Sequence, residues 1–223
     1  MIVLGIETAT ALCSAGLAGE DGLIAEHRLI RKNSHAEVLS DLVDGVCRSA
    51  KIPLKKVEGV AVSIGPGSFT GLRIGLSYAK GLVFGFDIPF IGVPTLEAIL
   101  RPVPPVCSHA CVLLTARKGE AYRGSFHWKA DQWTAYREDD VVGEADLVKG
   151  FPKDEALLFI GSGTEQFRDV LSRNSGAVFL KTDLNYPSGY SVAVLGRERM
   201  LAGERTDPDS AVPRYLKRFQ GVV

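Results

Sequence analysis

A glycine-rich segment, Ser63 to Gly75, constrains the fold of this chain more than any other part of the sequence. The apolar run before it, Val57–Ile64, is typical of a buried strand, and it stops at a Gly-Pro-Gly turn. Helical spacing then continues to about Val83. Because glycine adopts backbone conformations closed to other residues, such a unit can hold amides close to an anion or a partner. The segment therefore predicts either a phosphate-binding turn or a helix packed unusually closely.

The turn does not complete either common nucleotide-binding motif. No Gly-Lys-Ser/Thr follows at the P-loop spacing, and the third glycine of a dinucleotide fingerprint falls at Gly71, one position late. A generic anion-binding turn stays open as an interpretation. Its candidate contacts with nucleotide or anion are Gly65, Gly67 and Ser68.

The helix after the turn carries small residues at regular spacing. Gly71, Gly75 and Ala79 recur every four residues and form one smooth stripe. Each glycine inside a helix costs about 0.5–1 kcal/mol relative to alanine, so two of them need a compensating benefit. We therefore expect close packing of this stripe, either inside the fold or against another chain.

Composition excludes several classes of protein. Lys plus Arg equals Asp plus Glu at 26 each, so no global field attracts nucleic acid or anionic membrane. The first apolar run meets Glu7 at once, and nothing approaches the roughly 18 apolar residues that span a bilayer. The four cysteines have no CxxC pairing and no complete set of metal ligands. We expect a cytoplasmic protein with reduced thiols, no metal and no membrane association.

The order of elements predicts an α/β fold with two lobes. Three short strands, a helix with a Ser34/Glu37 capping box, and the strand–turn–helix unit come first, followed by a strand at Phe90–Val93. Prolines after residue 101 mark a break, so we predict an N-terminal lobe of residues 1–101 and a C-terminal lobe of residues 102–223. In the second lobe we expect strands at 110–115, 120–128, 133–138 and 157–160, and helices at 165–172 and 192–201. A final helix, about 210–220, is a candidate to pack back on the first lobe.

Two further corners carry residues suited to a nucleotide. Glu7 and Thr8 end the first strand, where a carboxylate and a hydroxyl can handle metal-bound phosphate. Gly161 and Gly163 lie between a strand and a helix. Each corner has an equally simple structural interpretation as a turn with a helix cap.

A hairpin in the second lobe concentrates charge. Arg117 and Lys118 are its candidates for contact with RNA or phosphate, although such hairpins are commonly solvated loops. His35, in the first turn of its helix, lacks a second histidine four residues on, which favours a structural role.

Four stretches of the chain together resemble the TsaB (YeaZ) family: Val3–Thr10, Ser63–Gly81, Ala116–Tyr122 and Pro213–Leu216. The resemblance covers nearly the whole chain. It implies the actin/Hsp70/sugar-kinase (ASKHA) fold, with two lobes that each contain a mixed sheet and flanking helices. It also implies a role in making N6-threonylcarbamoyladenosine in tRNA. An aspartate usually precedes the Ala-Arg-Lys run of this family, and here Thr115 takes its place.

TsaB proteins are similar to their catalytic partner TsaD, which binds a metal through a His-x-x-x-His pair. Thr95 and Ile99 stand at the corresponding positions here, and neither replaces imidazole as a ligand. The resemblance therefore implies a partner and activator subunit with no catalytic residue and no cofactor of its own, with ATP or ADP at a shared interface of the complex. The alternative is an ATP-hydrolysing, kinase-like enzyme. The missing histidine pair disfavours a metallopeptidase.

The resemblance further implies that two helices, about Ser34–Ala50 and Thr70–Val83, contact the TsaD-type partner. The residues predicted to bind that partner are His35, Leu39, Leu42, Val46, Gly71, Leu72, Gly75 and Ala79. We also expect a TsaE-type ATPase in the assembly, a homodimer when the TsaD-type partner is missing, and indirect or weak contact with tRNA.

Overall fold

The computed structural model describes residues 1–31, 34–152, 154–180 and 183–216, which form two compact units. Unit 1 contains residues 1–98 and 187–214, and unit 2 contains residues 99–186 and, among the described residues, 215–216. The predicted boundary at residue 101 is close to the observed one. The predicted C-terminal lobe of residues 102–223 is wrong over residues 187–214, because this segment returns to the first unit.

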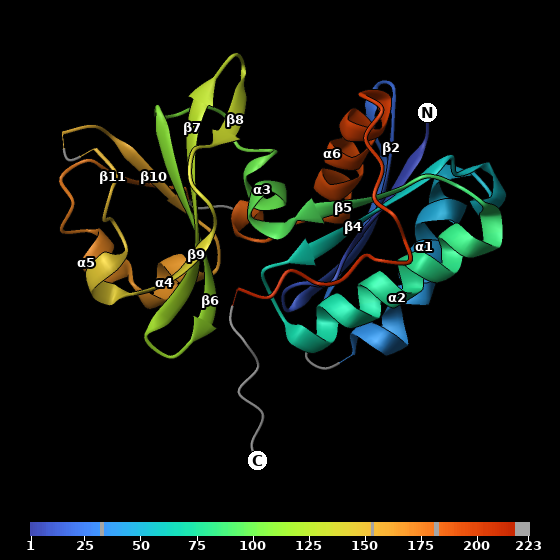
Figure 1. Ribbon diagram of the computed structural model, residues 1–223, viewed down its shortest axis with the longest axis horizontal. Coiled ribbons are helices and arrows are strands. Elements are labelled where there is room, and N and C mark those ends of the chain that lie inside the picture. The colour runs from blue at the N-terminus through green and yellow to red at the C-terminus, as the bar shows by residue number, and fades with distance from the viewer. Residues whose placement is uncertain (32–33, 153, 181–182, 217–223) are drawn as a thin grey trace. The chain divides into compact units, whose positions relative to one another are not determined.

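Unit 1 is built on a five-stranded mixed sheet in the order β3-β2-β1-β4-β5 (Figure 1). The neighbours β1 and β2 are antiparallel, as are β2 and β3, whereas β1, β4 and β5 run parallel. The strands are β1 (Val3–Glu7), β2 (Leu12–Gly19), β3 (Gly22–Ile30), β4 (Gly59–Gly65) and β5 (Phe90–Pro94). The predicted order of strands and helices in the first hundred residues is confirmed, with η1 (Leu54–Lys56) and α3 (Thr95–Leu100) as additions.

Helices cover both faces of this sheet. On one face lie α1 (His35–Ala50) and α2 (Phe69–Phe86), which share a core with alternate side chains of the central strands, Leu4 and Ile6 among them. On the other face lies α6 (Gly189–Leu201), which packs on Val3 and the opposite set. Successive strand residues point to opposite faces, so a strand that is buried along its whole length, such as β1, needs a helix on each side.

The return of α6 to unit 1 is secured by Glu26 of β3. Its Oε1 accepts from the Tyr190 amide at 2.9 Å and from the Ser14 hydroxyl at 3.1 Å. The Ser14 hydroxyl in turn accepts from the Gly189 amide at 3.0 Å. A carboxylate at a helix N-terminus satisfies amides that lack a partner within the helix. Sequence periodicity predicts this helix, but it does not say which sheet the helix covers.

Unit 2 contains a sheet in the order β11-β10-β6-β7-β8, and β9 pairs with the part of β7 that does not pair with β8. The buried Arg123 guanidinium anchors β9 and the turn after it, through Asp140 at 2.6 Å and the Asp146 carbonyl at 2.6 Å. Its elements are β6 (His109–Arg117), β7 (Glu120–Lys129), β8 (Gln132–Ala135), β9 (Asp140–Gly143), η2 (Glu144–Asp146), β10 (Leu157–Ile160), α4 (Gly163–Gln166), α5 (Arg168–Leu171), β11 (Ala177–Phe179) and η3 (Asp183–Asn185). The helix predicted at 165–172 is therefore two short helices, and the strand predicted at 133–138 is shorter and begins at Gln132.

The predicted final helix at about 210–220 does not form over residues 210–216, and residues 217–220 lie outside the described residues. Residues 204–214 instead run along unit 1, where the Arg214 amide donates to the Ile64 carbonyl at 2.6 Å and the Thr206 amide to the Phe90 carbonyl at 2.8 Å. Within the described ranges, no helix has the length and apolar character needed to cross a membrane.

Candidate functional site

Two turns of unit 1 close on each other at the end of β1. The Ser68 amide donates to the Ala9 carbonyl at 2.7 Å, and a Cβ built on Gly67 would lie 2.3 Å from the same oxygen. Gly65 has φ +113°, a backbone conformation that other residues rarely adopt. The glycines of the predicted anion turn therefore allow it to approach the neighbouring turn of the same chain.

Glu7, the last residue of β1, is completely buried. Its Oε1 accepts from the Ala9 amide at 2.5 Å, and its Oε2 accepts from the Ser63 hydroxyl. Burial raises the pKa of the Glu7 carboxyl to about 7, while the hydrogen bonds from Ser63 and Ala9 act in the opposite direction. Both oxygens are thus engaged by the chain itself, at a position that solvent does not reach.

Thr8 is where the glycine stripe of α2 meets the sheet. A Cβ on Gly71 would lie 2.0 Å from the Thr8 carbonyl oxygen, and one on Gly75 would lie 2.2 Å from Thr8 Oγ1. Ala79, the third member of the stripe, is fully buried in the core. The stripe therefore packs against its own chain, and its assignment as a partner-binding surface is wrong. Spacing shows that a helix face is smooth, but not which way that face points.

The other predicted partner contacts also point inward. Leu39, Val46 and Leu72 are buried, and Leu42 packs half-buried against the core. The His35 ring Nε2 bonds the Thr10 carbonyl oxygen at 2.9 Å, which joins the start of α1 to the β1–β2 turn. Helical spacing identified the apolar face of α1 correctly, and that face is the one that covers the sheet.

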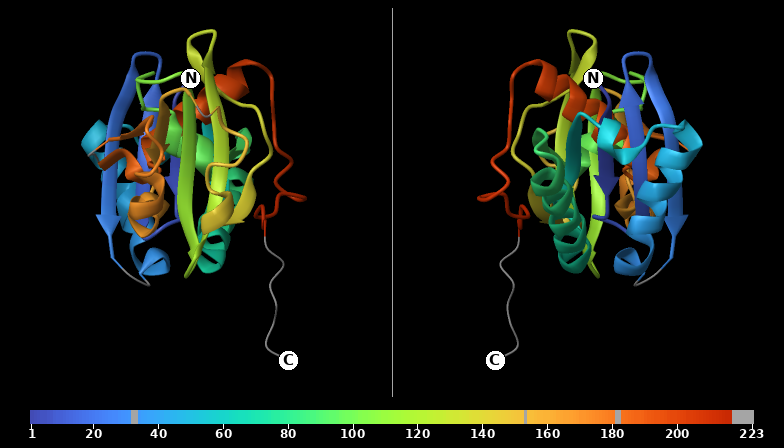
Figure 2. Two further views of the ribbon diagram at one scale, coloured as in Figure 1. Left: turned by 90° about the vertical axis from the view of Figure 1, so that its left-hand side faces the viewer. Right: turned by 90° about the vertical axis from the view of Figure 1, so that its right-hand side faces the viewer.

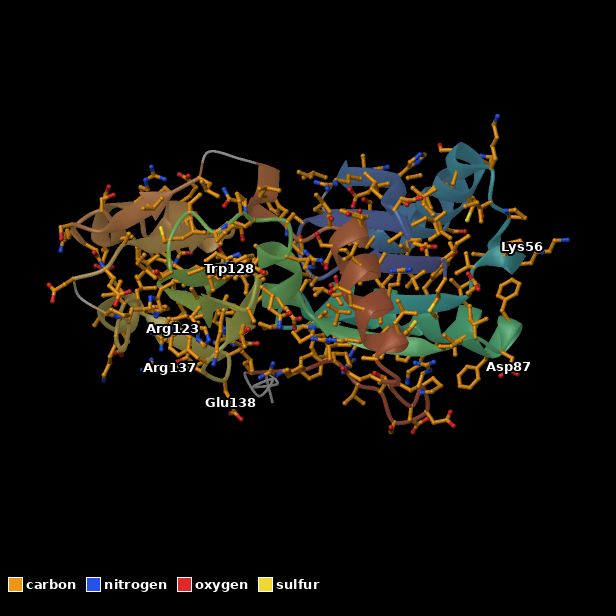
Figure 3. The ribbon with its side chains drawn as sticks, turned by 90° about the horizontal axis from the view of Figure 1, so that it is seen from above. Lys56, Asp87, Arg123, Trp128, Arg137 and Glu138 are labelled. Atoms are coloured by element: carbon orange, nitrogen blue, oxygen red, sulfur yellow. The ribbon has the colours of Figure 1, made fainter. Side chains whose placement is uncertain are left out.

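The outward face of α2 carries residues that the sequence reasoning did not select. Arg73, Ser77, Gly81 and Phe84 are exposed, and Phe84 is exposed to 62%. A Cβ on Gly81 would meet nothing within 4 Å among the described residues. Asp87 ends the helix at one end of unit 1, as Figure 3 shows. The available signal was a second run of small residues, Ser77, Gly81 and Gly85, at the same spacing as the first.

On α1, Asp41 and Asp44 are exposed, which places two carboxylates on the outward face of this second helix. The two helices contact each other along the same layer of unit 1. Their outward faces together form the surface that we call the α1/α2 outer face.

In unit 2, the turn at Gly161 and Gly163 lies tightly on β6. Gly161 has φ +104°, and a Cβ there would lie 2.2 Å from the Leu113 carbonyl oxygen. The Thr164 hydroxyl donates to the Gly161 carbonyl at 2.8 Å, and the Gly161 amide donates to Asn185 Oδ1 at 3.0 Å. These contacts favour the structural interpretation of this turn over nucleotide contact.

Arg117 and Lys118 are exposed in the β6–β7 hairpin, as the sequence predicted, and so is Thr115. Thr95 and Ile99, the positions at which the resemblance implied a lost histidine pair, are fully buried on α3. Across the described ranges, no three side chains of His, Cys, Asp or Glu come together as a metal-binding group would.

Comparison with known proteins identifies the relatives of this chain. The family model described as TsaD, tRNA N6-adenosine threonylcarbamoyltransferase, matches residues 27–220. The tRNA threonylcarbamoyladenosine biosynthesis protein TsaB of Bacillus subtilis (strain 168) is 28% identical over 220 residues, which cover 97% of this chain and 94% of that protein.

Two solved structures show the fold. YeaZ from Pseudomonas aeruginosa superposes with a TM-score of 0.84 at 22% identity, over 96% of this chain and 99% of that one. Component A of the (R)-2-hydroxyglutaryl-CoA dehydratase from Acidaminococcus fermentans gives a TM-score of 0.57 at 7% identity, over 90% and 99% of the two chains. These likenesses confirm the actin/Hsp70/sugar-kinase type of fold expected from the sequence.

Proposed function

Because the chain belongs to the TsaD family of tRNA N6-adenosine threonylcarbamoyltransferases, as a TsaB (YeaZ) member, we propose that it is a partner and activator subunit without catalytic activity of its own. It acts in the biosynthesis of threonylcarbamoyladenosine in tRNA, the process for which its relative from Bacillus subtilis is named. The enzyme that it supports is a TsaD-type protein, which transfers the threonylcarbamoyl group.

The observation that carries this proposal is the sealed carboxyl of Glu7. A catalytic acid, base or metal ligand must come within hydrogen-bond reach of its substrate or ion. Both Glu7 oxygens instead bond to Ser63 and Ala9, and the residue is fully buried. Thr95 and Ile99 offer no imidazole to a metal. No observation favours the alternative of a kinase-like enzyme that uses Glu7.

We place the partner contact on the α1/α2 outer face. Gly81 costs its helix about 1 kcal/mol relative to alanine, and within the described structure no neighbour uses the space that it leaves. A helix of the partner that lies across this flat position gains close backbone approach, with Phe84 as an apolar anchor. Asp41 and Asp44 supply charge at the margin of the contact. When the partner is missing, the same face joins two copies of the chain.

The remaining components follow from the same proposal. The chain needs no cofactor, and ATP or ADP binds at an interface shared with the complex. A TsaE-type ATPase completes the assembly in the cytoplasm. Arg117 and Lys118 give tRNA a weak contact through their exposed charges.

The test is a reconstituted modification assay with the TsaD-type protein of the same organism. Threonylcarbamoyl incorporation into tRNA should require this chain, and Glu7→Gln should leave the turnover of the complex within about twofold. Gly81→Leu should weaken partner binding at least tenfold, because a branched side chain holds the helices apart. Ala202→Leu, at an exposed position at the end of α6, is the matched control and should bind the partner normally.

Two results would contradict the proposal. A loss of about 100-fold in turnover by Glu7→Gln, with partner binding intact, would make this carboxyl catalytic. Stoichiometric binding of ATP by the isolated chain, measured by calorimetry, would favour the kinase-like alternative instead.

A further inference from the structure

The outer edge of the unit 1 sheet carries a concentration of exposed apolar side chains. All of them lie on β3, which forms one margin of the sheet, as Figure 2 shows. Their exposed fractions are 53% for Leu23, 38% for Ile24, 37% for Leu29 and 61% for Ile30. Natural proteins rarely leave an apolar edge strand unprotected, because its free amides and carbonyls pair readily with another strand.

The two edge strands of this sheet differ in whether another segment of the chain covers them. At the β5 margin, the Thr206 amide and hydroxyl bond the backbone of Phe90 and Gly92, so the C-terminal segment covers that edge. At the other margin, β3 pairs with β2 alone among the residues that the structure describes. A β-bulge lies near the start of β3, and from Ala25 to Ile30 the pairing with β2 is regular. The regular part is therefore the part suited to accept another strand.

The sequence of β3 is complementary to itself when it is turned around. It reads Leu-Ile-Ala-Glu-His-Arg-Leu-Ile from Leu23 to Ile30. In an antiparallel pair centred on His27, Glu26 lies opposite Arg28 of the other strand, and Arg28 lies opposite Glu26. The apolar residues that begin one strand lie beside the apolar residues that end the other.

Charge strengthens this pairing. Within one chain, the Arg28 guanidinium already bonds Glu26 Oε2 at 2.5 Å, and the Arg28 side chain keeps 38% of its surface exposed. Pairing two copies about His27 places the exposed Arg28 of each copy opposite Glu26 of the other, whose side chain is 8% exposed and whose carboxylate already bonds Ser14, Tyr190 and Arg28 of its own chain. No like charges face each other in this register, which is the condition that cross-strand pairs require.

We propose that β3 pairs antiparallel with β3 of a second copy of this chain, about a two-fold axis at His27, so that two five-stranded sheets become one continuous sheet. A strand from an unrelated protein would not require the reversed order of charges, whereas a second copy supplies it. This edge is formed by β3, whereas the α1/α2 outer face is formed by the two helices, so the two proposed contacts use different residues. The inference does not depend on the proposed function.

The first test measures mass by light scattering and sedimentation in a Phe84→Lys background, which disables self-association through α2. A single pair of strands buries an area at the low end of the range for stable interfaces, so we expect a dissociation constant on the order of 10–100 µM for the dimer. Ile30→Lys should weaken the dimer at least tenfold, because it places charge in the apolar contact twice. Leu201→Lys, at a side chain exposed to 59% on α6, is the matched control and should leave the dimer intact.

Charge reversal tests the complementarity. Arg28→Glu should raise the dissociation constant of the dimer at least tenfold, because four carboxylates would then face one another. Arg173→Glu, at an exposed site of unit 2, should leave that constant unchanged. A chain that stays monomeric at 200 µM would overturn the proposal. So would a dimer that survives both Ile30→Lys and Arg28→Glu.

The second test reads the register directly. Residues opposite each other in an antiparallel pair have Cα atoms about 4.5–5.5 Å apart, within the range that a disulfide bridges. His27→Cys should therefore form a cross-linked dimer under mild oxidation, whereas Ala25→Cys alone should not. In a Cys13→Ala background, a mixture of Ala25→Cys and Leu29→Cys should cross-link, since these positions face each other across the axis; Cys13 is replaced because it lies opposite residue 29 within one chain. Cross-linking of Ala25→Cys alone, or none with His27→Cys, would contradict this register.

Discussion

Replacing Gly71 with alanine should destabilise this protein, although alanine is the better helix former. A Cβ at Gly71 would lie 2.0 Å from the Thr8 carbonyl oxygen, whereas carbon and oxygen atoms in contact lie about 3.3 Å apart or more. The obstacle is backbone at the end of a central strand, and it has no rotamer to change. Either α2 or the β1–β2 turn must move by about 1 Å.

Two opposing terms set the size of this effect. Alanine in place of glycine inside a helix returns about 1 kcal/mol. Overpacking a core costs about 1–3 kcal/mol, and a rigid backbone neighbour places Gly71 at the upper end of that range. We therefore expect Gly71→Ala to lower the free energy of unfolding by about 2 kcal/mol. Gly81→Ala lies on the same helix, and its Cβ would have nothing within 4 Å in the described structure. It therefore gains the helix propensity of alanine without overpacking, and it should raise the free energy of unfolding by about 0.5–1 kcal/mol.

Urea unfolding followed by far-ultraviolet circular dichroism measures both changes. For a chain of this length, 2 kcal/mol corresponds to a melting temperature lower by about 4–8 °C. Hydrogen exchange at the α2 amides should accelerate in Gly71→Ala and slow in Gly81→Ala. If the two variants are equally stable, or Gly71→Ala is the more stable, the stripe does not pack on Thr8 as described.

Three further perturbations test the interior. Because burial raises the pKa of Glu7 to about 7 from 4.5, the folded state keeps a proton that the unfolded state releases, so stability should fall by up to about 3 kcal/mol as pH rises from 5 to 8. Glu7→Gln should flatten that dependence in urea titrations at the two pH values. Thr8→Val should raise the free energy of unfolding by about 1 kcal/mol by calorimetry, since the buried hydroxyl finds no hydrogen-bond partner in the described ranges. Arg123→Met should lower the stability of unit 2 by about 1–2 kcal/mol, measured by tryptophan fluorescence, because it removes the hydrogen bonds of the guanidinium to half-exposed Asp140 and to the carbonyls of Asp146, Leu147 and Lys149.

Each of these three substitutions has a control at an exposed position that should leave the free energy of unfolding nearly unchanged. The controls are Glu20→Gln for the pH dependence, Thr70→Val for the loss of the hydroxyl and Lys129→Met for the loss of the cation. A pH dependence of Glu7→Gln parallel to that of the parent would remove Glu7 as its source. A loss of stability in Thr8→Val would mean that its hydroxyl is bonded. If Arg123→Met left the stability of unit 2 unchanged, the guanidinium would not anchor β9 and the turn after it.

Sequence reasoning succeeded where a single segment decides the outcome. The spacing of Leu39, Val43 and Val46 identified the buried face of α1, and the apolar run before Gly65 identified a central strand. It failed where two distant segments decide together. The helix at α6 was predicted correctly but assigned to the wrong unit, since the need to cover the second face of the first sheet is a property of the sheet and not of residues 187–214.

The same distinction explains the interpretation of α2. This helix carries two sets of small residues, one at Gly71 and Gly75 and one at Ser77 and Gly81, and the sequence alone does not rank them. The first set admits the Thr8 backbone, so its glycines are explained inside the chain. In the second set, a Cβ on Gly81 would meet no described residue within 4 Å, which is the space that we propose a partner occupies. The glycines that first suggested an anion site thus pack within their own chain, and Gly81 and Gly85, which no described residue approaches within 4 Å of a Cβ, lie on the outward face where we propose that the partner binds.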